Sequence, residues 1–122
     1  MQRDFTFVDD VVESVIRVLD RPPQPDAAFD RQHPHPAHSW APYRVLNVGN
    51  HSPVELMTYI RTLERALGVT ARLEMKPMQA GDVPATHADT RALQALIGFA
   101  PATTVEQGIA RFVQWYRGYY RV

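Results

Sequence analysis

Residues 1–12 read MQRDFTFVDDVV, and this stretch contains the signals for two elements of secondary structure. From residue 3 to residue 8, phenylalanines alternate with other side chains, a pattern that predicts a β-strand. Asp10 and Glu13 then stand three positions apart in a capping-box pattern, which predicts a helix that begins there and runs to about Leu19. The stretch therefore indicates an α/β fold in which a strand leads directly into a helix.

The predicted helix is apolar around most of its circumference. Its apolar residues are Val11, Val12, Val15, Ile16, Val18 and Leu19. A helix with so wide an apolar surface packs against neighbours on two sides. We therefore expect this helix to need more covering surface than a small domain provides.

Later segments add two strands and three helices. Tyr43–Val48 is apolar on both faces, as in a strand of a parallel sheet, and residues 72–76 alternate cleanly. Helices are predicted over 53–67, 90–97 and 105–116. The candidate N-cap is Ser52 for the first, Asp89 or Thr90 for the second, and Thr103 or Thr104 for the third. The first helix ends at Gly68 and the second at Gly98. The order β-α-β-α-β-α-α predicts a small three-stranded α/β unit.

Residues 21–42, RPPQPDAAFDRQHPHPAHSWAP, are rich in proline and show no periodicity. A connection of this length inside a domain is commonly flexible or functional, and we predict a flexible loop. Its histidines, His33, His35 and His38, could form a loop metal site. Because ordering a mobile backbone around an ion is unfavourable, a solvated loop is the favoured interpretation.

The composition argues against several classes of function. Thirteen basic and thirteen acidic residues cancel, which argues against nucleic acid or an anionic membrane as a partner. The absence of cysteine excludes disulfides and thiolate metal sites. No apolar run approaches the ~20 residues of a membrane span, and no signal-peptide pattern leads the chain, so we expect a cytoplasmic protein.

Residue spacing reveals no catalytic constellation. His51 and His87 are candidate bases, but neither has a nucleophile at a diagnostic spacing, so structural roles are favoured. Asp9 and Asp10 could act as paired carboxylates, although a helix cap explains them without chemistry.

One loop is better suited to bind a ligand. Lys76–Thr86 follows a predicted strand and contains Gln79 and Asp82, at the place where α/β folds position ligand contacts. Arg3 carries a planar, permanent charge that suits a phosphate, whereas a surface ion pair with Asp4 or Glu13 is the simpler alternative.

Five segments in this order resemble the C-terminal part of the nucleotide-sugar epimerases of the extended short-chain dehydrogenase/reductase superfamily, above all the UDP-glucuronate 4-epimerases. They are RDFTFVDDVV, YRVLNVGNHSPVEL, PMQAGDVPATHAD, GFAPATTVEQGI and FVQWY. The resemblance implies a full-length enzyme with an N-terminal Rossmann domain that binds NAD and a small C-terminal domain that binds the UDP-sugar.

The resemblance also implies roles for four residues. Arg3 matches the arginine that contacts the nucleotide diphosphate, and Asp82 matches the acidic residue that reaches the ribose. Gln79 occupies a position that faces the nucleotide, and Thr86 one near the hexose pocket.

The chain departs from the family pattern in its catalytic part. It has no glycine-rich fingerprint, and its sole lysine, Lys76, has Arg72 four residues before it, so no Tyr-x-x-x-Lys pair exists. We therefore expect residues 1–122 to be the C-terminal substrate-binding portion of such an epimerase, without the Rossmann domain, without catalytic residues and without an NAD site of its own.

We expect this portion to be inactive alone, to bind UDP-sugars weakly and to self-associate through exposed apolar surface. The alternative is a stand-alone module, either a non-catalytic nucleotide-sugar binder or a homo-oligomeric interaction protein.

Overall fold

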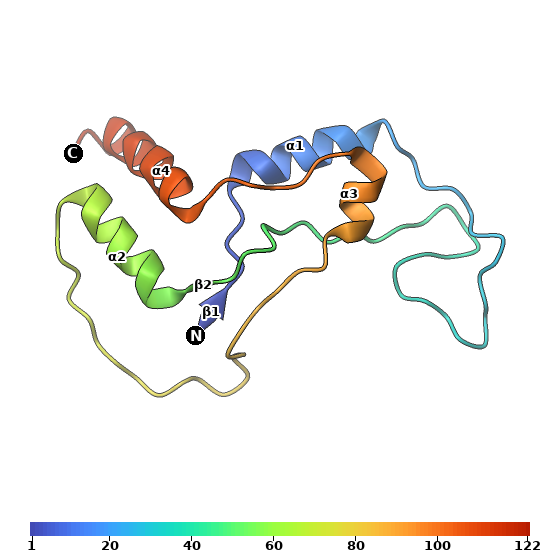
Figure 1. Ribbon diagram of the computed structural model, residues 1–122, viewed down its shortest axis with the longest axis horizontal. Helices are drawn as coiled ribbons and strands as arrows, with labels where there is room; N and C mark the ends of the chain where they lie inside the picture. Colours follow the sequence, from blue (N-terminus) through green and yellow to red (C-terminus); the bar gives the residue numbers. More distant parts are fainter.

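Four helices and one short sheet make up the computed structural model, which describes residues 1–122 (Figure 1). The strands are β1 (Gln2–Arg3) and β2 (Val54–Glu55), and the helices are α1 (Val8–Leu19), α2 (Leu56–Leu67), α3 (Arg91–Ile97) and α4 (Val105–Tyr120). Helix α2 packs beside α4, and α1 contacts α3 (Figure 1). None of the helices combines the length and apolar character needed to cross a membrane.

The N-terminal segment is held on both sides by later parts of the chain. On one side β1 pairs antiparallel with β2, placing Gln2 opposite Glu55 and Arg3 opposite Val54. On the other side Gln2 forms a parallel bridge to Ala85. The chain therefore brings two distant segments, β2 and the stretch at Ala85, against residues 1–4.

The predicted three-stranded unit is corrected to a two-stranded sheet. Of the predicted strand 3–8, only Arg3 lies in β1. Residues 43–48 retain a single bridge between Arg44 and His38, and 72–76 form no strand. Alternating polarity indicates that a segment, if extended, would have one apolar and one polar face. A strand forms only where a neighbouring segment also supplies hydrogen bonds along its length.

Two predicted helix starts are also wrong. Helix α1 begins at Val8 with Phe7 as its N-cap, so Asp10 lies inside the first turn and caps nothing. Helix α2 begins at Leu56, because Val54 and Glu55 pair with β1 before the helix can start.

The other end signals are confirmed. Gly68 and Gly98 end α2 and α3 in the left-handed conformation, with φ of 72° and 63°, which glycine adopts without a steric penalty. Thr104 and Gln107 form the capping box of α4, with reciprocal hydrogen bonds of 3.3 and 3.2 Å.

The main core lies between α2 and α4. Val105, Ile109 and Val113 of α4 are buried, and Phe5 stacks on Tyr59 with ring centroids 4.3 Å apart beside them. A second small contact buries two residues of α3, Leu93 and Ile97. Only 10 of the 122 residues are buried, so these cores leave much apolar surface uncovered.

Helix α1 keeps most of the apolar surface noted in the sequence. Its exposed apolar residues are Val8, Val12, Val15, Ile16 and Leu19, with exposed fractions from 49% to 74%. The structure thus leaves a wide apolar face of α1 without a partner inside the chain.

Asp10 joins α1 to the start of α4. Its carboxylate accepts hydrogen bonds from the backbone N–H groups of Ala102 and Thr103, at 3.2 and 2.9 Å, and from the Thr103 hydroxyl at 3.0 Å. Asp9, the next residue along the helix, only approaches Arg111 at 3.5 Å on the surface.

We predict that Asp10→Ala lowers the free energy of unfolding by about 2 kcal/mol, because three donors lose a charged acceptor. The matched control, Asp9→Ala, removes the same charge from the same helix turn and should change stability by less than about 0.5 kcal/mol. Urea unfolding measures both. Equal losses in the two variants would show that Asp10 acts only through the helix dipole.

Candidate functional site

Arg3 and Asp82 meet although 79 positions separate them in the sequence. Nη2 of Arg3 lies 2.5 Å from Oδ1 of Asp82, and Nη1 donates to the carbonyls of Val83 at 2.7 Å and Gln2 at 3.0 Å. The two side chains are partly shielded, with 21% and 37% of their surfaces exposed. The pair therefore anchors the 79–86 loop against β1.

Arg3 keeps donors for an outside acceptor. A guanidinium carries five N–H groups, and the contacts within the chain use two at Nη1 and one at Nη2. The Nε–H and the second Nη2–H remain. These groups can form two parallel hydrogen bonds to a phosphate or carboxylate.

Thr86 lies beside the same segment. Its hydroxyl accepts a hydrogen bond from the backbone N–H of Asp4 at 3.1 Å, and its own N–H donates to the Gln2 carbonyl at 3.2 Å. The structure thus brings Thr86 to the strand that carries Arg3.

Gln79 is linked to this group only through the backbone. Its carbonyl accepts from the Asp82 N–H at 3.2 Å, in a turn where Gly81 has a φ of 89°. The Gln79 side chain is exposed and makes no hydrogen bond to the rest of the chain. Three of the four predicted residues therefore converge, and the side chain of Gln79 stays apart.

The structural role of Asp4 was not predicted from the sequence, which indicated only a possible ion pair with Arg3; Arg3 binds Asp82 instead. Its carboxylate accepts from the backbone N–H groups of His51, Ser52 and Ala88, at 3.2, 3.3 and 3.4 Å. These contacts hold His51 in the left-handed region, at a φ of 55°. An acidic residue inside an apolar alternating stretch was the available signal, because such a carboxylate needs local donors.

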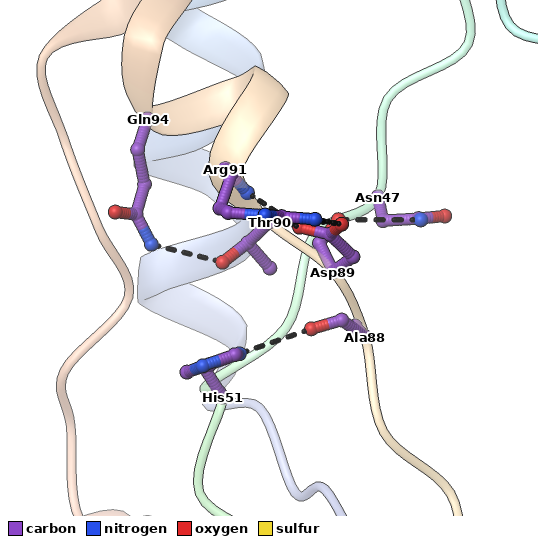
Figure 2. A network of polar contacts seen from close by, with 7 residues as sticks. All are labelled: Asn47, His51, Ala88, Asp89, Thr90, Arg91 and Gln94. Atoms are coloured by element: carbon purple, nitrogen blue, oxygen red, sulfur yellow. Dashed lines mark hydrogen bonds and ion pairs between the residues drawn. The ribbon is translucent and has the colours of Figure 1, made fainter.

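A second polar network fastens residues 47–51 to the start of α3 (Figure 2). The Asn47 amide donates to the Asp89 carbonyl at 3.3 Å, and Nδ1 of His51 lies 3.2 Å from the Ala88 carbonyl oxygen. Arg91 binds the Asp89 carboxylate with Nη2 at 2.6 Å and with Nε. These hydrogen bonds from Arg91 hold the pKa of Asp89 well below its usual range.

The remaining histidines are divided between two places. The ring centroids of His51 and His87 lie 4.5 Å apart. In the 21–42 segment, His33 pairs with Asp30 at 3.0 Å, which lowers the pKa of that carboxyl, and His38 pairs with Asp26 at 2.7 Å. No three His, Asp or Glu side chains converge to form a metal site.

Comparison with known proteins identifies the relatives of this arrangement. The family described as GDP-mannose 4,6 dehydratase matches residues 1–112. A probable UDP-glucuronate 4-epimerase from Rhizobium meliloti is 48% identical over 99% of this chain and 36% of its own length. UDP-glucuronate 4-epimerase 2 from Arabidopsis thaliana is 37% identical, over 98% of this chain and 26% of its own length.

A solved structure has a similar fold. The structure of MoeE5 in complex with UDP-glucuronic acid and NAD superposes with a TM-score of 0.72 and 29% identity, over 97% of this chain and 34% of MoeE5. The chain thus spans about a quarter to a third of the length of these relatives. These matches confirm the resemblance to nucleotide-sugar epimerases indicated by the five sequence segments.

Gly49 lies where the Asp4 contacts leave no room for a side chain. A Cβ added at this position would lie 2.6 Å from the Ala88 Cβ and 2.9 Å from Oδ2 of Asp4. At Gly118, in α4, an added Cβ would meet nothing within 4 Å.

We predict that Gly49→Ala destabilises the protein by about 2 kcal/mol through overpacking. Gly118→Ala, the same change in an open helical position, should stabilise it by about 0.5 kcal/mol. Thermal unfolding of both variants tests this difference. A neutral Gly49→Ala would mean that the loops around Asp4 yield without strain.

Proposed function

Because the chain belongs to the GDP-mannose 4,6 dehydratase family, we propose that residues 1–122 form the C-terminal, UDP-sugar-binding portion of a nucleotide-sugar 4-epimerase of the UDP-glucuronate type. The observation that carries this proposal is the junction of Arg3, Asp82 and Thr86, formed by segments far apart in sequence. On this proposal, the substrate site lies where β1 meets the 79–86 loop.

The geometry supports distinct roles for the charged pair. The two unused N–H groups of Arg3 would hold the diphosphate, and the Asp82 carboxylate would accept hydrogen bonds from the ribose hydroxyls. Since a diphosphate and a carboxylate repel each other, Arg3 would have to lie between them, where its charge offsets both.

Thr86 and Gln79 would act at either end of the nucleotide sugar. The hydroxyl of Thr86 already accepts from Asp4 N, so its proton is available to a sugar oxygen. The exposed amide of Gln79 can supply both a donor and an acceptor to the nucleotide.

The residues present do not fit the NAD that relatives bind. A dinucleotide site needs a glycine-rich turn between a strand and the start of a helix. Here Gly68 and Gly98 end helices, and Gly81 lies in the 79–82 turn. With no Tyr-x-x-x-Lys pair either, we propose that this chain alone neither binds NAD nor epimerises UDP-glucuronate.

The large exposed surface of the chain supports the proposal that part of it is covered by another domain or chain. The chain exposes 9310 Å², whereas a compact monomer of 13.9 kDa exposes roughly 6,700 Å². The excess is larger than the roughly 800 Å² that each partner contributes to a standard interface. We propose that a Rossmann domain covers the apolar face of α1 in the complete enzyme, and that isolated chains cover it by self-association.

We predict weak binding of UDP-glucuronate, with a dissociation constant in the millimolar range, because these residues provide only part of the pocket. In amide NMR titrations, shifts should concentrate in residues 2–4 and 79–86. Arg3→Ala should abolish them, and Arg17→Ala, which removes an exposed arginine paired with Glu13, should not.

Three results bear on this prediction. Unchanged spectra at saturating millimolar ligand would contradict the proposed site. An undiminished response in Arg3→Ala would remove Arg3 from it. Submicromolar affinity would favour the alternative of a stand-alone nucleotide-sugar binder.

We further predict that the isolated chain forms dimers or larger species in sedimentation velocity at tens of micromolar. Ile16→Glu places a charge on the apolar face of α1 and should shift the population toward monomer. Val69→Glu, at an exposed position outside this face, is the control. A strictly monomeric wild-type chain would contradict the prediction.

A further inference from the structure

The 21–42 segment, residues 43–46 and the ends of two helices line a hollow with both polar and apolar walls. The segment leaves the end of α1 and returns toward α3 (Figure 1). The hollow has a volume of about 420 Å³, within the range of small-molecule sites. Its charged and polar lining residues include Arg21, Arg44, Gln24 and Tyr43.

Specific contacts fix the walls of this hollow. The Asp26 N–H donates to the Ser39 carbonyl at 2.9 Å, and the Val45 N–H donates to the Ala37 carbonyl at 2.8 Å. Prolines at 22, 23 and 25 restrict the backbone on one wall, which lowers the entropy lost on ordering it. The segment predicted as a flexible loop thus has cross-links on which a binding site can be built.

The charges of the hollow are unbalanced. Its one carboxylate, Asp26, is paired with His38 at 2.7 Å. Arg21 and Arg44 make no ion pair and no side-chain hydrogen bond within the chain, whereas Arg3, Arg17 and Arg91 each bind a carboxylate. Two arginines therefore line the same hollow, and neither guanidinium has an acceptor within the chain.

The C-terminal end of α1, which lies beside the hollow, does not prevent an anion from binding there. Helix C-termini carry a partial negative charge, which opposes an anion. In this structure the Arg21 N–H donates to the Val18 carbonyl at 2.9 Å, which satisfies one of the terminal carbonyls. The side chain of the same residue adds a full positive charge at that end.

We propose that this hollow binds a phosphate dianion, held by Arg21 and Arg44. Two guanidinium groups match the charge of about −2 on a phosphate monoester near neutral pH. The Tyr43 hydroxyl and the Gln24 amide supply further hydrogen bonds, while Leu46 and Leu96 give an apolar wall against which a sugar or nucleoside ring can pack. Helix α1, roughly 18 Å long, separates this site from Arg3.

The test is an amide NMR titration of the wild-type chain with inorganic phosphate and with ribose 5-phosphate, against sodium chloride at equal ionic strength. Saturable shifts are expected in residues 21–26 and 43–46. Arg21→Gln and Arg44→Gln should each weaken phosphate binding about tenfold. Arg31→Gln, in the same segment but stacked on Trp40, should leave binding unchanged.

The two ligands identify the source of the phosphate. Tighter binding of ribose 5-phosphate supports a monoester site, and equal affinity supports a site for free phosphate. Shifts that rise without saturation, or that persist equally in both arginine variants, overturn the proposal. Because the site lies apart from Arg3, its failure would leave the proposed UDP-sugar site untouched.

Discussion

The arrangement of the N-terminal segment depends on the hydrogen bonds that the Asp4 carboxylate accepts. It binds backbone N–H groups from residues 51, 52 and 88, so one side chain ties two loops to the same short stretch. Arg3 is its neighbour in the chain, and its guanidinium reaches Asp82 from a backbone already fixed on both sides. A half-buried carboxylate with three donors thus sets the position of the backbone that carries the Arg3 guanidinium.

The helices show what local sequence can predict. Helix α4 begins at Val105 because the capping box of Thr104 and Gln107 is completed within four residues. Gly68 and Gly98 end their helices through their own conformational freedom. The predicted starts of α1 and α2 were wrong because contacts with distant residues determine where these helices begin. Asp10 binds Thr103 instead of capping α1, and Glu55 pairs with Gln2 before α2 can begin.

The candidate site follows the same division. Resemblance placed Arg3, Asp82 and Thr86 in one site, and the structure brings them to one strand, although no local pattern requires residues so far apart to meet. The role of Asp4 was not predicted because its partners are backbone groups, which no residue type in the sequence reveals. The same reason hid the hollow beside α1, whose shape depends on main-chain bonds of the 21–42 segment.

The long sequence separation of the β1 pairings has a consequence for the order of folding. Gln2 makes its sheet contacts with residue 55 on one side and with residues 84–86 on the other, so every pairing of this strand spans more than fifty positions. Long-range pairings form slowly, because loop closure must precede the contacts that compensate for it. During synthesis, the edge of β1 that pairs with residues 84–86 therefore stays without its hydrogen-bond partners until residue 86 has left the ribosome.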